Sequence, residues 1–93
     1  MALDPNNLSP ARKAKTYTTF TSDLDLIADS GTDKVACRRI RVVSGGVVGV
    51  YFKDDPGTLV LITYAAGDTD DVQLSKIARA ADGTTATAVT VYW

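Results

Sequence analysis

The chain has 93 residues and offers few side chains for catalysis. It contains no histidine, which removes the usual general base and the commonest nitrogen ligand for metals. The single cysteine, Cys37, therefore has no imidazole to activate it as a nucleophile, and it cannot form an internal disulfide. The carboxylates remain as candidates for catalysis or metal binding, and all eleven are aspartates.

One of these aspartates lies in a suggestive segment. Residues 26–33 read Leu-Ile-Ala-Asp-Ser-Gly-Thr-Asp, which resembles the catalytic loop of retroviral-type aspartic proteases. That resemblance implies a β-rich homodimer in which each chain supplies one aspartate, here Asp29, and the pair shares a proton. The family also has two apolar residues and a glycine before a short helix, whereas residues 81–84 read Ala-Asp-Gly-Thr. Because Asp-Ser-Gly is also a common turn, we expect Asp29 to be a turn residue and keep the protease as an alternative.

A second group of aspartates occupies predicted turns. Asp68-Thr69-Asp70-Asp71, together with Asp54 and Asp55, is rich in oxygen ligands of the kind that Ca²⁺ prefers. An EF-hand loop, however, ends in a glutamate, and the chain contains none. We interpret these side chains as solvated turn carboxylates and expect no metal and no cofactor.

The arginines are a further candidate group. Four of them could line a phosphate-binding face: Arg38, Arg39, Arg41 and Arg79. Such a row on an outward strand face is more typical of a solvated surface or a subunit contact. The formal charge of −1 argues against a general nucleic-acid binder.

The elements that position these groups are predicted to be strands. Twelve threonines and ten valines, with no glutamate and one glutamine, favour β structure over helix. We predict one all-β domain, a small antiparallel β-sandwich or barrel of about seven short strands, and no helix. No stretch is long and apolar enough for a membrane-spanning helix or a signal peptide, so we expect intracellular synthesis and no membrane partner.

The segment 37–50 organises the predicted sheet. Ile40 and Val42 share one face of a strand, Arg39 and Arg41 share the other, and Ser44-Gly45-Gly46 follows as a turn. We predict a hairpin here, with a second apolar arm after the turn.

Later segments add three expectations. Residues 59–64 are apolar on both faces, which predicts a central strand or one sealed by another subunit. The apolar phase slips by one residue near Ser75 and Lys76, which predicts a β-bulge. Val89, Val91 and Trp93 alternate with polar or aromatic residues in a closing strand.

The N-terminal segment, residues 1–15, has two prolines and no sustained apolar period. We predict a flexible arm over residues 1–15 and a folded domain over residues 16–93. The arm ends in three basic residues that can dock on an acidic neighbour: Arg12, Lys13 and Lys15.

Several short pieces of sequence occur in a characteristic order: Thr21-Ser22-Asp23, then Arg39-Ile40-Arg41-Val42 with Ser44-Gly45-Gly46, then Ala66-Gly67-Asp68, and finally Gly83-Thr84-Thr85-Ala86-Thr87 before an aromatic end. Together they resemble the head-spike base proteins of tailed bacteriophages and gene transfer agents, over residues 16–93. The chain departs from that family in Arg41, where an aromatic is expected, and in a longer 68–81 segment.

The resemblance implies a non-enzymatic structural protein of the virion, synthesised in the host cytoplasm. Such a protein is the base of a capsid head spike or head fibre, or a decoration protein, on the capsid exterior. Its expected partners are copies of itself in a ring (a pentamer, or alternatively a trimer), the major capsid protein and the spike fibre protein. A generic β-sandwich adaptor or carbohydrate-binding module is a further alternative. The expected docking residues are Arg12, Lys13, Lys15, Arg39, Arg41, Tyr92 and Trp93.

Overall fold

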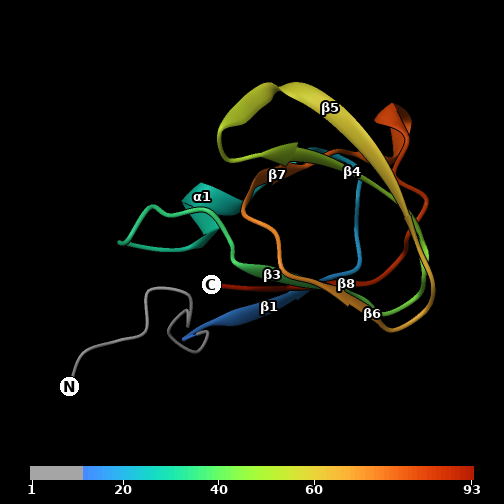
Figure 1. Cartoon of the computed structure of the whole chain (residues 1–93), viewed down its shortest axis with the longest axis horizontal. Helices are drawn as coiled ribbons and strands as arrows, with labels where there is room; N and C mark the ends of the chain where they lie inside the picture. Colours follow the sequence, from blue (N-terminus) through green and yellow to red (C-terminus); the bar gives the residue numbers. More distant parts are fainter. Residues whose placement is uncertain (1–11) are drawn as a thin grey trace.

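The computed structural model describes residues 12–93, which form two four-stranded antiparallel sheets (Figure 1). Sheet A has the strand order β1-β8-β3-β6, and sheet B has the order β2-β7-β4-β5. The fold is therefore a small all-β sandwich with eight strands, as the composition predicted. The strands are β1 (Ala14–Tyr17), β2 (Leu24–Asp25), β3 (Arg39–Val42), β4 (Gly46–Phe52), β5 (Asp55–Tyr64), β6 (Asp68–Asp70), β7 (Leu74–Ile77) and β8 (Val89–Tyr92).

The core lies between the two sheets and consists of the inward-facing residues of the strands, which alternate with outward-facing ones except at the bulge in β7. Sheet A contributes Ile40, Val42, Val89 and Val91, all fully buried, and sheet B contributes a matching set. The members from sheet B are Val48, Val50, Leu74 and Ile77. This period of two is the pattern expected for strands with one face on the core and the other on solvent.

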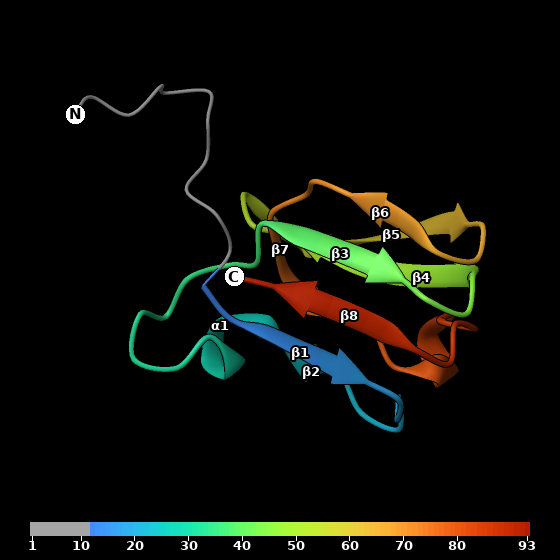
Figure 2. The same cartoon turned by 90° about the horizontal axis from the view of Figure 1, so that it is seen from below.

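The expected hairpin over residues 37–50 is wrong, because β3 and β4 belong to different sheets (Figure 2). The turn after Val42 carries the chain from sheet A across to sheet B. Gly45 and Gly46 both have positive φ, and a Cβ on Gly45 would lie 2.7 Å from the main-chain nitrogen of Ala66. The glycines therefore permit an arch over the end of the core, where only a glycine fits.

The segment 59–64 was expected to be central or sealed by another subunit, and the central position is wrong. It belongs to β5, which is an edge strand of sheet B. The predicted bulge is confirmed, since Tyr51 pairs with Lys76 and Phe52 with Leu74, which leaves Ser75 as the extra residue. The Ser75 hydroxyl donates a hydrogen bond to the Tyr51 carbonyl oxygen.

Two short helices were not expected from the sequence. Helix α1 (Leu26–Asp29) follows β2, and the Asp25 carboxylate caps it by accepting a hydrogen bond from the Ala28 amide at 3.1 Å. A 3₁₀ turn, η1 (Ala80–Asp82), follows β7. Among residues 12–93, no helix is long and apolar enough to span a membrane.

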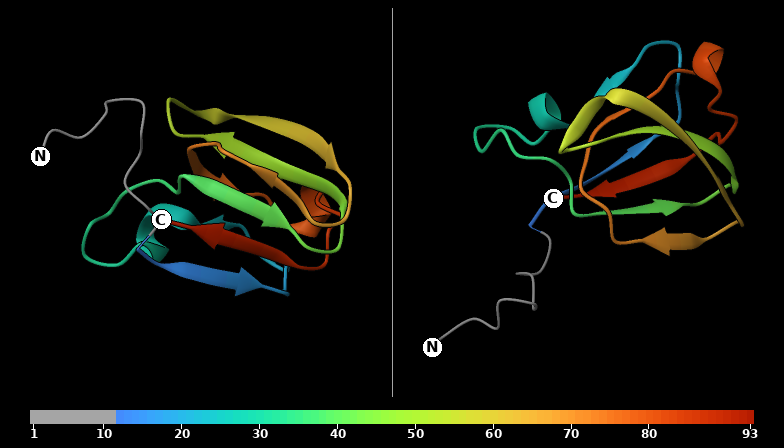
Figure 3. Two further views of the ribbon diagram at one scale, coloured as in Figure 1. Left: turned by 60° about the horizontal axis from the view of Figure 1, so that its bottom comes forward. Right: turned by 45° about the horizontal axis from the view of Figure 1, so that its top comes forward.

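Strand β1 begins at Ala14, two residues before the predicted start of the domain at residue 16, and pairs with β8. The Arg12 amide donates to the carbonyl oxygen of Trp93. Figure 3 shows the start of β1 and the C-terminus side by side in both views. The part of the predicted arm over residues 1–11 lies outside the described residues.

Two tyrosines join the sheets where consecutive strands change sheet. The Tyr17 hydroxyl, on β1, donates to the carboxylate of Asp29 at 2.5 Å, just after β2. The Tyr64 hydroxyl, at the end of β5, donates to the carboxylate of Asp70 on β6 at 2.7 Å. These two tyrosine–aspartate bonds link the sheets at the two edges of the sandwich, where β1 lies next to β2 in sequence and β5 next to β6.

Two threonines of the segment 83–87 form hydrogen bonds that hold the connection between β7 and β8 against sheet B. The Thr84 hydroxyl is buried, accepts a hydrogen bond from the Gly49 amide at 2.9 Å and donates to the Ala78 carbonyl oxygen at 2.7 Å. The Thr85 hydroxyl accepts from the amide of Val47. These hydroxyls accept hydrogen bonds from the amides of Val47 and Gly49, in the part of β4 that does not pair with β7.

Candidate functional site

The outer face of sheet A brings together several of the predicted docking residues. The strand register places Arg39 opposite Tyr92, and Arg41 opposite Thr90, which in turn lies opposite Thr16. Residues directly opposite one another in antiparallel strands share a face. Because Ile40 and Val42 are buried, these side chains face outward. We call this set the arginine face: Thr16, Arg39, Arg41, Thr90 and Tyr92.

The two arginines of this face differ in their partners. The Arg39 side chain forms an ion pair with Asp71, with Nε to Oδ1 at 2.5 Å. This bond raises the pKa of Arg39 and lowers the pKa of Asp71. The side chain of Arg41 makes no hydrogen bond or ion pair with any other residue of the 12–93 range. Arg41 is therefore the cation of this face that is available to a partner.

The other basic docking candidates are partly occupied by the chain itself. The Lys13 ammonium lies 5.3 Å from the centre of the Trp93 ring and donates to the Asp29 carbonyl oxygen. The Lys15 ammonium lies 5.0 Å from the centre of the Tyr17 ring and 3.9 Å from the Asp29 carboxylate. Both lysines lie beside the C-terminus and not on a free arm.

Trp93, which was expected among the docking residues, is buried. Its side chain is only 5% exposed, and the indole N–H donates to the Leu26 carbonyl oxygen at 2.8 Å. Trp93 continues the inward alternation of β8 and packs at the end of the core. Tyr92 remains half-buried on the opposite face.

Asp29 ends helix α1 and turns its carboxylate toward its own chain. The carboxylate accepts the Tyr17 hydroxyl and lies near the Lys15 ammonium. Burial, and then this hydrogen bond, raise the pKa of Tyr17 well above its ordinary value of 10.0. The protonated tyrosine therefore stabilises the fold fully below pH 10, and this contribution is lost as the pH rises further.

We expect the Asp29→Asn variant to fold, with a free energy of unfolding within about 1 kcal/mol of the parent chain. The asparagine oxygen can still accept the Tyr17 hydroxyl, and an exposed pair such as Lys15–Asp29 contributes little. Denaturant unfolding measures this difference. Cleavage of peptides at acid pH by the parent chain, blocked by a transition-state inhibitor and lost in Asp29→Asn, would instead support the protease alternative.

The acidic turn residues are engaged by neighbours. Asp68 accepts a hydrogen bond from the Ala65 amide, Asp70 accepts the Tyr64 hydroxyl, and Asp71 binds Arg39. Within the described range, 12–93, no group of three or more metal-binding side chains lies close enough together to hold an ion.

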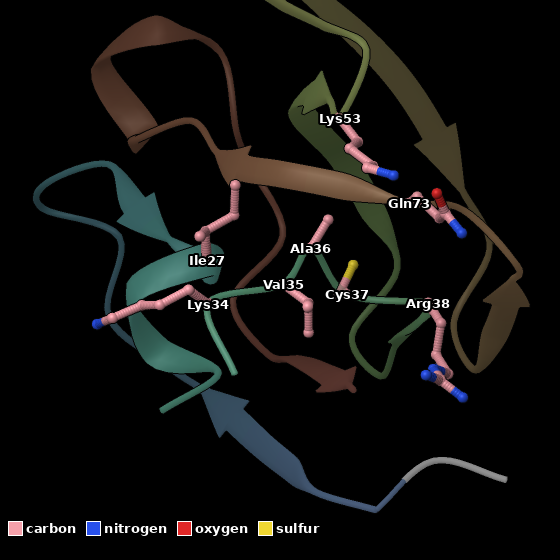
Figure 4. Close-up of a pocket in the computed structure, with 8 residues that line it drawn as sticks. All are labelled: Ile27, Lys34, Val35, Ala36, Cys37, Arg38, Lys53 and Gln73. Atoms are coloured by element: carbon pink, nitrogen blue, oxygen red, sulfur yellow. The ribbon is translucent and has the colours of Figure 1, made fainter. Parts of the chain in front are cut away.

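Sequence reasoning missed a hollow of about 330 Å³ beside the segment that precedes β3 (Figure 4). It is bordered by Ile27, Lys34, Val35, Ala36, Cys37, Arg38, Lys53 and Gln73. Three of these are cationic, yet Figure 4 shows the ammonium of Lys34 turned away from that of Lys53. The Cys37 thiol is buried, which raises its pKa to about 11. The hollow therefore lacks converging charges and an active nucleophile.

No model of a known protein family matches the chain, and no curated protein or solved structure is significantly similar to it.

Proposed function

We propose that the chain is a structural protein of a virion, the base of a capsid head spike or head fibre. It assembles as a homo-oligomeric ring on the outside of the shell, where it contacts the major capsid protein and holds the fibre. The observation that supports this proposal best is the contrast between its two outer sheet faces. Sheet A presents the arginine face, and sheet B presents an apolar face.

The arginine face has the composition of a protein interface. Arginine and tyrosine are enriched in such interfaces, and lysine is depleted. Arg39 and Arg41 project from a strand that is paired on both sides, so a partner that covers them does not have to order the backbone as well. Arg41 can bind a carboxylate or a carbonyl oxygen of a neighbouring subunit through its planar fork of donors.

The apolar face gives the same small domain a second contact. Leu59 is 38% exposed and Leu61 is 54% exposed, and both lie over Gly49 of β4. A subunit in a ring contacts a neighbour on each side through different surfaces, which is the heterologous arrangement that closes a ring. Two unlike faces on opposite sides of one sandwich suit that arrangement.

Light scattering of the purified protein over a range of concentrations tests the assembly. We expect a species of five copies of the 9.9 kDa chain, and enrichment of the protein in purified particles. The double variant Arg39→Asp, Arg41→Asp should shift the mass toward smaller species, because it places like charges where the ring contact needs cations. The matched control is Arg79→Asp, which changes an exposed arginine outside this face.

A protein that stays strictly monomeric at high concentration and is absent from particles would overturn the proposal. Equal mass for the double variant and the Arg79→Asp control would show that the arginine face is not the ring contact.

A further inference from the structure

Strand β5 is the longest strand of the fold and lies at the edge of sheet B. Val60–Tyr64 and Asp55 pair with β4 on one side, and the other side of β5 has no strand beside it within the described residues. Pro56 to Tyr64 contains no charged residue. An edge of this length with no charge is a template for pairing with another strand.

The other edges of the sandwich lack this character. β2 has two residues and β6 has three. β1 has four residues and carries Lys15, and an edge lysine is a common device against unwanted pairing. β6 contains Asp68 and Asp70 within its three residues. β5 is thus the one described edge that is long, apolar and without a protecting charge.

We propose that β5 pairs antiparallel with β5 of a second copy of this chain, about a two-fold axis at Val60. Sheet B and its copy then form one continuous eight-stranded sheet. Such an interface is isologous, since the same patch is used by both copies.

The register follows from the alternation of the strand. The main-chain groups directed away from β4 belong to alternate residues, so odd residues of one copy must lie opposite odd residues of the other. With the axis at Val60, Leu59 lies opposite the partner's Leu61, and Leu61 lies opposite the partner's Leu59. An axis at Leu59 would instead set Leu61 against Gly57, and an axis at Leu61 would set Leu59 against Thr63. Only the axis at Val60 gives both leucines an apolar partner.

The positions of the acidic residues near the start of β5 are also compatible with this register. Asp54 and Asp55 lie at the start of β5, so a two-fold axis at Val60 places the two acidic pairs at opposite ends of the joined strands. The two Asp55 residues are about 34 Å apart along the strands at the usual rise per residue. That exceeds the screening length of about 8–10 Å in physiological salt, so their repulsion is negligible.

Cysteine cross-linking tests the register, in a Cys37→Ala background that removes the native thiol. Residues directly opposite have Cα atoms about 4.5–5.5 Å apart, within the range for a disulfide. Leu59 and its own copy would be about 8 Å apart, which is too far. We expect mild oxidation to cross-link a mixture of Leu59→Cys and Leu61→Cys proteins efficiently, and each protein alone at least five-fold less.

The matched control is Val43→Cys, whose parent side chain is 44% exposed and lies outside β5. Cross-linking of the mixture at the level of a Val43→Cys and Leu61→Cys mixture would overturn the proposal. Equally efficient cross-linking of Leu59→Cys alone would also overturn it, because the register would then be different.

A second variant tests the contact without a thiol. Leu61→Lys places a charge on the edge, and we expect it to remove the two-fold association detected by light scattering, a dimer of single chains or of rings, while Val43→Lys retains it. A dimer that survives Leu61→Lys would overturn the proposal. The inference does not rest on the proposed function, since a β5 dimer can form whether or not the arginine face closes a ring. Leu61 also belongs to the apolar face proposed as a ring contact, so the Leu59–Leu61 cross-link, which only β5 pairing predicts, distinguishes this proposal from the ring. The Arg39→Asp, Arg41→Asp variant tests the ring.

Discussion

Replacing Trp93 with alanine should lower the free energy of unfolding by about 3–5 kcal/mol, the usual cost of truncating a buried aromatic side chain. The ring is 5% exposed, packs at the end of the core and carries the Lys13 ammonium over its face. Its indole N–H also donates a hydrogen bond to the carbonyl oxygen of Leu26, the first residue of helix α1. Since domains of this size are stable by only about 5–15 kcal/mol, we expect a large fall in the denaturant midpoint.

Trp93→Phe is the matched control for that experiment. It keeps an aromatic ring in the core but removes the hydrogen bond to Leu26 and part of the ring volume, so we expect a loss of about 1–2 kcal/mol, smaller than for alanine. If Trp93→Ala unfolds at the same denaturant concentration as the parent chain, the side chain is not part of the core. Its original interpretation as a docking residue would then deserve a new test.

The two interpretations of Trp93 show what a strand pattern can and cannot give. The alternation predicted a closing strand over Val89, Val91 and Trp93, and these three residues, which share one face of that strand, are buried. Trp93 was nevertheless expected among the docking residues. The Trp93 side chain is held by a hydrogen bond to Leu26, which is distant in sequence. The alternation of residues along one strand contains no information about such long-range contacts.

The arch between β3 and β4 has the same explanation. Strands β3 and β4 each have an apolar face. Two strands paired in one sheet would show this pattern, and so would two strands that face each other across a core. Only the pairing of β3 with β8, and of β4 with β7, decides between them. These partners lie far along the chain, so the fold class and most strands were predictable but the connection was not.

Thr84→Val should cost about 2–4 kcal/mol, because it leaves two buried main-chain groups without a partner. The Thr84 hydroxyl accepts from the Gly49 amide and donates to the Ala78 carbonyl oxygen, and valine has the same shape with neither function. Thermal or denaturant unfolding measures the loss. The cost comes from unmet hydrogen bonds and not from a cavity.

Thr85→Val serves as the comparison, since the two threonines are adjacent and differ in burial. Thr85 is exposed, so water can replace its hydroxyl at the Val47 amide, and we expect a change below about 1 kcal/mol. Equal effects of the two variants would contradict the assignment of Thr84 as the buried joint between β4 and the 83–87 segment.

The surface features, like the fold, were only partly predictable from the sequence. Arg39 and Arg41 were placed outward by the alternation with Ile40 and Val42, and the structure agrees. The edge position of β5 was not predictable, because an apolar strand reads alike at the centre and at the border of a sheet. Ala14 and Lys15 lacked an apolar period, so their place in β1 depends on pairing with β8 alone.

The buried thiol of Cys37 provides a built-in reporter of local motion. Burial keeps it from reagents, and its raised pKa, about 11, keeps it protonated at neutral pH. A thiol-specific dye should therefore react only during transient openings of the segment before β3, so its labelling rate measures how often that segment opens. Because no other cysteine is present, each labelling event reports one place in the molecule. Slower labelling on assembly would show that neighbouring copies hold this end of the sandwich shut.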